Sequence, residues 1–171
     1  MLKLIALAAA AASTTTASPT LDPTAPWWEK VTVTMTGDGN PQSCRYQSSR
    51  LPAGAQECEV EGDAHAVQAS GSVDEVTSIT FERRFSPGAR PDKGDVQPGD
   101  TLLGGQVMAL AIDSSGAVRG CEIVATGGSM TPDYGCAQAK AEKFEASAPT
   151  GEAPRRAYLT VLVYAHAENL A

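Results

Sequence analysis

Residues 155–168 read RRAYLTVLVYAHAE, and this stretch decides the kind of fold that the chain can form. Apolar side chains occupy both alternating sets of positions between Leu159 and Val163, so both faces of the strand that they predict are apolar. A strand with two apolar faces needs cover on both sides, which favours a place in the middle of a sheet. The sequence therefore predicts a β-sheet with this segment as a central strand.

Four earlier segments predict further strands. KVTVTMT at residues 30–36 and VTSITFERRF at residues 76–85 alternate apolar with polar residues, as half-buried strands do. GQVMALAID at residues 105–113 is a longer apolar run, and VRGCEIVAT at residues 118–126 follows it after a turn sequence. On the second of these four segments, one side carries Ile79, Phe81 and Phe85.

One helix is predicted in the second half of the chain, over residues 134–145. Asp133 lies just before it and can accept backbone hydrogen bonds at the helix start. In the first half, the residues near Cys58 leave room for a short helix. The apolar positions at helical spacing in the second half are Tyr134, Ala137, Ala141 and Phe144.

The four cysteines occur in two similar sequence patterns. GNPQSCRYQ at residues 39–47 and GAVRGCEIV at residues 116–124 each place a cysteine five residues after a glycine, and a second cysteine follows each. The wide gap to the second cysteine does not fit a zinc site, whose ligands come in close pairs. Four cysteines in an oxidising compartment favour two disulfides, for which three connectivities exist.

The repeated pattern predicts both the architecture and the cysteine pairing. Each half is interpreted as two strands, a helix and a third strand, which gives two β-β-α-β repeats. A cysteine on the second strand and one at the helix start would cross-link helix and sheet, which favours Cys44–Cys58 and Cys121–Cys136. The predicted fold class is α+β, with small antiparallel sheets that each carry one helix packed on a face.

Composition divides the chain into five parts. Residues 1–17 have a basic start, a weakly apolar middle and small residues, which is the pattern of a secretory signal peptide. Residues 18–26 are rich in proline and are expected to form a flexible tether. We expect a divergent N-terminal repeat at 27–90, a linker rich in proline and glycine at 91–104, and a second repeat at 105–171.

The signal peptide and the cysteines predict a periplasmic or secreted protein. A net charge of −7 with only 13 Lys and Arg argues against nucleic acid as a partner, because phosphate binding needs clustered positive charge. After the signal peptide, no segment is long and apolar enough to span a membrane. The pairs Arg83-Arg84 and Arg155-Arg156 are interpreted as solvated strand faces.

No constellation of residues predicts catalysis. His65 and His166 are interpreted as surface residues rather than as bases. The sequence contains no nucleophile elbow, zinc-protease motif or phosphate-binding glycine loop. We therefore expect no catalytic residue, no metal site and no cofactor.

Residues 105–168 combine a turn at Gly116 and Val118, the small residues Gly127 to Ser129, Asp133, Phe144, and the apolar strand from Tyr158 to Tyr164. With this pattern, residues 105–168 resemble the C-terminal domain of TonB-like proteins, in a cysteine-bearing form. The sequence departs from that family at Ala146, where the family has a proline after the helix-terminal phenylalanine. It also shows neither the membrane helix nor the long proline-rich spacer of the members that transmit energy.

The resemblance implies a binding protein rather than an enzyme. Members of the family take up an extended peptide as an added strand at a sheet edge. The partner would be a protein or peptide of the cell envelope, or a second copy of the chain, because an apolar edge strand tends to pair. The alternative is an envelope thiol-redox protein, or another small secreted enzyme. If the final strand lies at an edge, the residues flanking the bound peptide are Tyr158, Thr160, Leu162 and Tyr164.

Overall fold

The computed structural model describes most of the chain between its two ends. The predicted signal peptide and residues 59–75, which include His65, lie outside the described part. The described residues are 20–51, 56–58, 76–94, 96–146 and 151–167.

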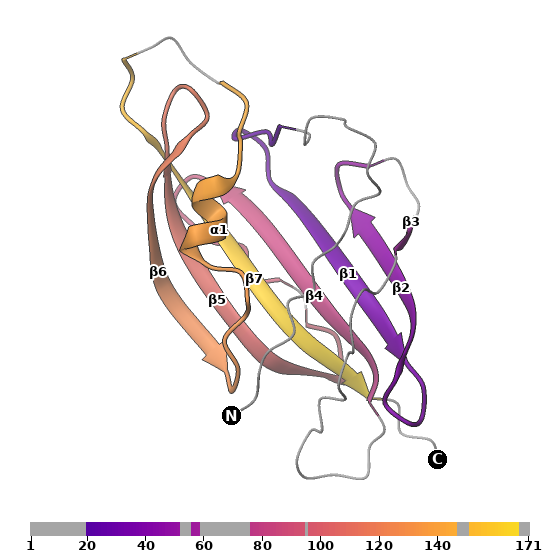
Figure 1. Cartoon of the computed structure of the whole chain (residues 1–171). Helices are drawn as coiled ribbons and strands as arrows, with labels where there is room; N and C mark the ends of the chain where they lie inside the picture. The colour runs from indigo at the N-terminus through magenta and orange to yellow at the C-terminus, as the bar shows by residue number, and fades with distance from the viewer. Residues whose placement is uncertain (1–19, 52–55, 59–75, 95, 147–150, 168–171) are drawn as a thin grey trace.

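Within these ranges the chain forms seven strands and one helix, and all seven strands belong to one antiparallel sheet (Figure 1). The strand order across the sheet is β3-β2-β1-β4-β7-β5-β6. The elements are β1 (Trp27–Met35), β2 (Pro41–Ser48), β3 (Gln56–Cys58), β4 (Val76–Pro87), β5 (Asp100–Ile112), β6 (Val118–Gly128), α1 (Cys136–Ala141) and β7 (Arg155–Ala167).

The predicted α+β class with two helix-covered sheets is therefore wrong. In the second half, the helix is only six residues long, because the backbone turns extended at Glu142 and Lys143 then bridges to Ala117. In the first half, Cys58 belongs to strand β3 and lies directly opposite Cys44 on β2, where a helix start was expected. The described part of the chain is a mostly β protein.

The final strand, β7, lies in the middle of the sheet, as its two apolar faces predict. It pairs with β4 from Val76↔Ala167 to Pro87↔Ala157, and with β5 on its other side. The two halves of the chain thus share one continuous sheet. In each half the first strand lies between the second and the last, so β1 separates β2 from β4, and β5 separates β6 from β7.

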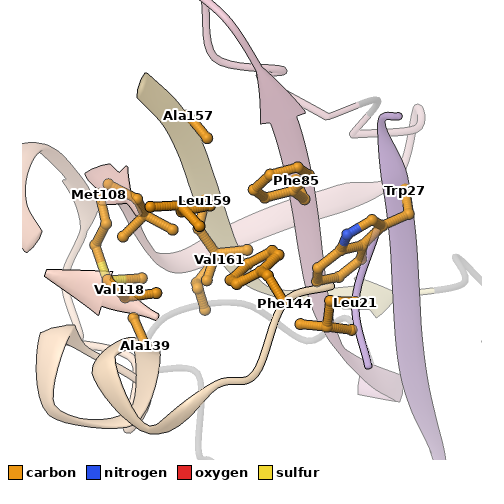
Figure 2. Close-up of a cluster of buried hydrophobic side chains, with 12 residues drawn as sticks. Leu21, Trp27, Phe85, Met108, Val118, Ala139, Phe144, Ala157, Leu159 and Val161 are labelled. Atoms are coloured by element: carbon orange, nitrogen blue, oxygen red, sulfur yellow. The ribbon is translucent and has the colours of Figure 1, made fainter. Parts of the chain in front are cut away.

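The hydrophobic core lies on one face of the sheet, here called the helix face, under α1 (Figure 1). Trp27 stacks on Phe85 with ring centroids 5.5 Å apart, and Phe85 contacts Phe144 at 5.2 Å (Figure 2). Ala139 is the buried residue of α1. Strands β5 and β7 add Met108, Leu110, Ile112, Ala157, Leu159 and Val161 to this cluster.

Within residues 18–26, which are expected to form a flexible tether, Leu21 packs against this core. Leu21 is buried, and its backbone N–H donates to the Lys143 carbonyl at 2.9 Å. The Glu145 N–H in turn donates to the Leu21 carbonyl at 2.8 Å. The apolar Leu21 thus covers the helix face beside Phe144, as Figure 2 shows.

The other face of the sheet is crossed by the connection from β4 to β5, and we call it the loop face. Because β7 lies between β4 and β5, this connection must pass over β7. There, Gly94 lies close to the side chains of Leu162 and Arg84. Strand β5 begins at Asp100, so the end of the predicted linker at 91–104 is part of the sheet.

The glycines of the two similar sequence patterns occupy the same place in two hairpin turns. The Gly39 N–H donates to the Thr36 carbonyl at 2.8 Å, and the Gly116 N–H donates to the Asp113 carbonyl at 3.0 Å. Their φ angles are 76° and 83°, in the left-handed region that glycine adopts most easily. A side chain at Gly116 would also overlap the carbonyl of Phe144.

Candidate functional site

The predicted binding residues on the final strand are not at an edge. Strand β7 is hydrogen-bonded on both sides, to β4 and to β5, so its backbone has no free edge for an added peptide. The four residues point to the loop face, and the Tyr164 hydroxyl donates to Glu82 at 3.0 Å. Strand addition at this place is therefore excluded for Tyr158, Thr160, Leu162 and Tyr164.

The outer strands of the described sheet are β3 and β6. Strand β3 has three residues, whereas β6 has eleven and pairs only with β5. The two residues just before β6 are covered, because the Phe144 N–H donates to the Gly116 carbonyl at 3.0 Å and Lys143 bridges to Ala117. From residue 119 to residue 127, no described segment pairs with the outer side of β6. We call residues 119–127 the open edge.

The open edge exposes apolar side chains. Ile123 is 46% exposed and Val124 is 49% exposed, and every residue from Glu122 to Gly128 is exposed. Arg119 and Val124 are extra residues in bulges, with no partner opposite them on β5. Bulges make an edge strand less inviting to unspecific pairing, but long, apolar edges are normally covered or charged. This edge therefore has the properties of an interaction surface.

A disulfide attaches α1 to the edge strand. Cys121 on β6 bonds to Cys136, the first residue of α1, with 5.6 Å between their Cα atoms. The second disulfide joins Cys44 to Cys58 across the neighbouring strands β2 and β3. The predicted pairing is confirmed for both bonds, but only the first links a helix to the sheet.

A small pocket lies at the end of the open edge. Its volume is about 160 Å³, and its polar lining comes from Gln106, Thr126, Ser129 and Thr131. Gln106 is 3% exposed, and its Nε2 donates to the Tyr134 carbonyl. The backbone N–H groups of Ser129 and Met130 both donate to the Leu103 carbonyl, which holds the loop against β5.

Arg83 forms a buried charge network on the helix face rather than a solvated surface. Its guanidinium donates to Glu29 at 2.6 Å and to Glu142 at 2.6 Å, and the Tyr134 hydroxyl also donates to Glu142 at 2.7 Å. Arg50 reaches the same Glu29 carboxylate at 3.0 Å. Burial alone would raise the pKa of Glu29, but the charges of Arg83 and Arg50 and the hydrogen bonds from Arg83 and Tyr46 outweigh it and lower that pKa.

Arg84 forms a second network on the loop face, since neighbouring strand residues point to opposite faces. It pairs with the fully buried Glu82 and, at 2.9 Å, with Asp92 of the crossover connection. Burial, followed by the charge of Glu82, raises the pKa of Tyr164. The prediction that Arg83 and Arg84 lie on a solvated strand face is therefore wrong for both residues. Arg155 and Arg156 are exposed.

The Nδ1 of His166 is hydrogen-bonded to a carboxylate oxygen of Asp100 at 2.8 Å. This histidine lies near the end of β7 and is half-buried. In the described part of the chain, no three His, Cys, Asp or Glu residues gather as a metal site would require. No described helix has the length and apolar character needed to cross a membrane.

Comparison with known proteins gives no relative. No family model, no curated protein and no solved structure matches the chain. The resemblance to TonB-like domains therefore stays a prediction from the sequence.

Proposed function

We propose that this protein is a non-enzymatic binding module of the cell envelope, TonB-like in its second half, that takes up an extended protein segment on the open edge of β6. The observation that carries this proposal is an eleven-residue outer strand paired on one side only, with Ile123 and Val124 about half exposed. An added strand gains main-chain hydrogen bonds along such an edge and covers its apolar side chains.

The order of the elements in the second half supports a TonB-like unit. The second half consists of two strands, a helix and a third strand, which is the order that the resemblance implies. The first half has the same strand order and the same turn around Gly39, so we infer that the two halves are related repeats. Because the last strands of the two halves pair with each other and β3 pairs with β2, β6 is the second strand whose outer side is unpaired in the described part of the chain.

The periplasm or the extracellular space is the proposed location. Two disulfides are formed among the described residues, and disulfides persist in oxidising compartments. The sequence of residues 1–17 adds the pattern of a signal peptide.

The test is capture of a partner from envelope extract with the full chain and with an edge variant. We expect Ile123→Lys/Val124→Lys to abolish capture, because charges would be buried against an incoming strand. Val96→Lys is the matched control, since Val96 is 44% exposed in a loop away from β6. Hydrogen exchange of the captured complex should show new protection within residues 119–127.

Capture that survives the edge variant, or protection that appears elsewhere, would refute the proposal. Sedimentation of the purified chain over a range of concentrations identifies the other occupant, a second copy of the chain. A dimer that Ile123→Lys/Val124→Lys dissociates, and that Val96→Lys leaves intact, would keep the edge as the site and make the protein its own partner.

A further inference from the structure

The side chains of the open edge divide between the two faces of the sheet. Ile123 lies opposite Met108, a core residue beneath α1, so Ile123 is on the helix face. Its neighbour Glu122 points to the loop face. Thr126 lies opposite Gln106, two residues from Met108, and is again on the helix face, where it lines the small pocket.

Glu122 is the charged residue of the open edge that has no ion pair within the described part of the chain. The other charged residue, Arg119, is bound to Asp113 through its Nε at 2.5 Å. Among the residues that the structure describes, none forms an ion pair with Glu122, which is exposed. A cross-strand neighbour of opposite charge stabilises pairing, and a negative one would oppose it. The net charge of −7 also favours the approach of a basic partner.

The pocket beside Thr126 fits one small polar side chain. Pockets for small-molecule ligands usually exceed about 300 Å³, and this pocket measures about 160 Å³. Thr126, Ser129 and Thr131 are among its lining residues, and each carries a hydroxyl group that can donate and accept hydrogen bonds with a polar group placed there. An aliphatic side chain would leave these groups without partners, which costs binding free energy.

The spacing of these features follows from β5, which already pairs with β6 on its other side. On β5, Ala109 lies opposite Glu122, and the adjacent Met108 lies opposite Ile123. Gln106 lies opposite Thr126 and is only two positions from Met108, because Val124 has no partner on β5. An added strand that mirrors this spacing places its side chains in the same way.

We propose that the segment recognised by the open edge carries a basic residue opposite Glu122, an apolar residue next to it opposite Ile123, and a small polar residue two positions further, in the pocket beside Thr126. This inference rests on the proposed function and names the chemistry of its partner. The order along the partner chain is basic, apolar, any residue, polar if the added strand runs parallel to β6, and the reverse if it runs antiparallel.

The test uses two synthetic peptides with blocked ends, Thr-Lys-Val-Thr-Ser-Thr and its reverse Thr-Ser-Thr-Val-Lys-Thr. Amide chemical shifts of the full-length, disulfide-bonded protein are followed during titration, which gives the dissociation constant and the location of binding. We expect one of the two orders to shift the amides of residues 119–127. Replacing its lysine by glutamate, or its serine by leucine, should weaken binding by about threefold or more.

A charge exchange makes the assignment of Glu122 specific. Glu122→Lys should bind the glutamate peptide better than the lysine peptide, which reverses the preference of the natural protein. Glu57→Lys on β3, at the opposite edge of the sheet, is the matched control and should leave the preference unchanged.

Peptides that all bind the open edge with equal affinity would overturn this inference and leave strand addition standing. A preference for lysine that survives Glu122→Lys would also overturn it. If no peptide of either order shifts the amides of residues 119–127, the inference fails; whether the proposed function fails with it is decided by the capture experiment, which uses natural partners.

Discussion

Arg83 is the side chain on which most of the buried polar contacts converge. Its guanidinium lies 5.9 Å from the ring of Trp27 and 4.7 Å from that of Tyr134, and it pairs with Glu29 and Glu142. These contacts join strands β1 and β4 to the segment on either side of α1. A buried charge that loses its partner is strongly destabilising, so the network stabilises the fold only when it is complete.

Replacement of Glu29 by glutamine should destabilise the protein in a pH-dependent way. The folded-state pKa of Glu29 is lowered from its ordinary value of 4.5, so its charge stabilises the fold above that pH. This contribution is lost as the pH falls through the lowered pKa. At pH 7 we expect Glu29→Gln to cost about 2 kcal/mol, because Arg83 and Arg50 lose a buried counter-charge.

Denaturant unfolding between pH 7 and pH 3 measures this effect. The difference in unfolding free energy between the natural protein and Glu29→Gln should shrink as the pH falls below 4.5. The exposed Glu152→Gln serves as control and should have little effect at any pH. A difference that stays constant with pH would contradict a charged Glu29 in the folded state.

Helix α1 is too short to be stable by itself, since isolated helices need about 12 residues or more. Its attachment to the sheet comes from the Cys121–Cys136 disulfide, the buried Ala139 and the packing of Phe144 beyond its end. The disulfide closes a loop with a sequence separation of 15 residues. In the chain-entropy model such a bond stabilises the fold by about 3 kcal/mol.

Removal of this bond in Cys121→Ala/Cys136→Ala should therefore lower Tm by roughly 6 to 12 °C under oxidising conditions. Under reducing conditions the loss relative to the natural protein should be small. Cys44→Ala/Cys58→Ala removes the other disulfide, which closes a loop of nearly the same length, and is the matched control. Exchange of the Ala139 amide should accelerate in the first variant and not in the second; equal losses of Tm with and without reductant would argue against the pairing.

The strands could be predicted from the sequence because their side chains alternate or form apolar runs. Ile79, Phe81 and Phe85 do share the helix face, and Leu159 and Val161 are buried in the middle of the sheet. The predicted helix was too long because Phe144 fits helical spacing and core packing equally well. It reaches the core from extended backbone that bridges to Leu21. Local periodicity does not distinguish these cases.

The candidate edge was missed because the position of a strand in the sheet depends on pairings that the sequence does not show. An apolar strand such as Tyr158 to Tyr164 predicts burial, but it does not say which strands cover its two sides. The useful signal was in the order of the elements. When a third strand returns to pair with the first, the second strand, here β6, is left at the edge.

The complete sheet consists of two three-stranded groups joined by the pairing of β4 with β7, with β3 added at one end. This joint uses both last strands, and the charge networks of Arg83 and Arg84 lie on its two faces. The joint therefore occupies the centre of the sheet and leaves β3 and β6 as its outer strands. Of these, β6 has the longer open backbone and the exposed apolar side chains.

Hydrogen exchange of the backbone amides, with and without a bound partner or peptide, tests this account most directly. In the free protein, we expect the amides of Leu159 to Val163 to exchange slowest, because β7 opens only when the whole sheet unfolds. The outward-pointing amides of residues 119–127 should exchange fast and become protected on binding, with no change in β7. Protection that appears at β3 or β7, or a β6 that is slow to exchange in the free monomer, would contradict the open edge as the binding site.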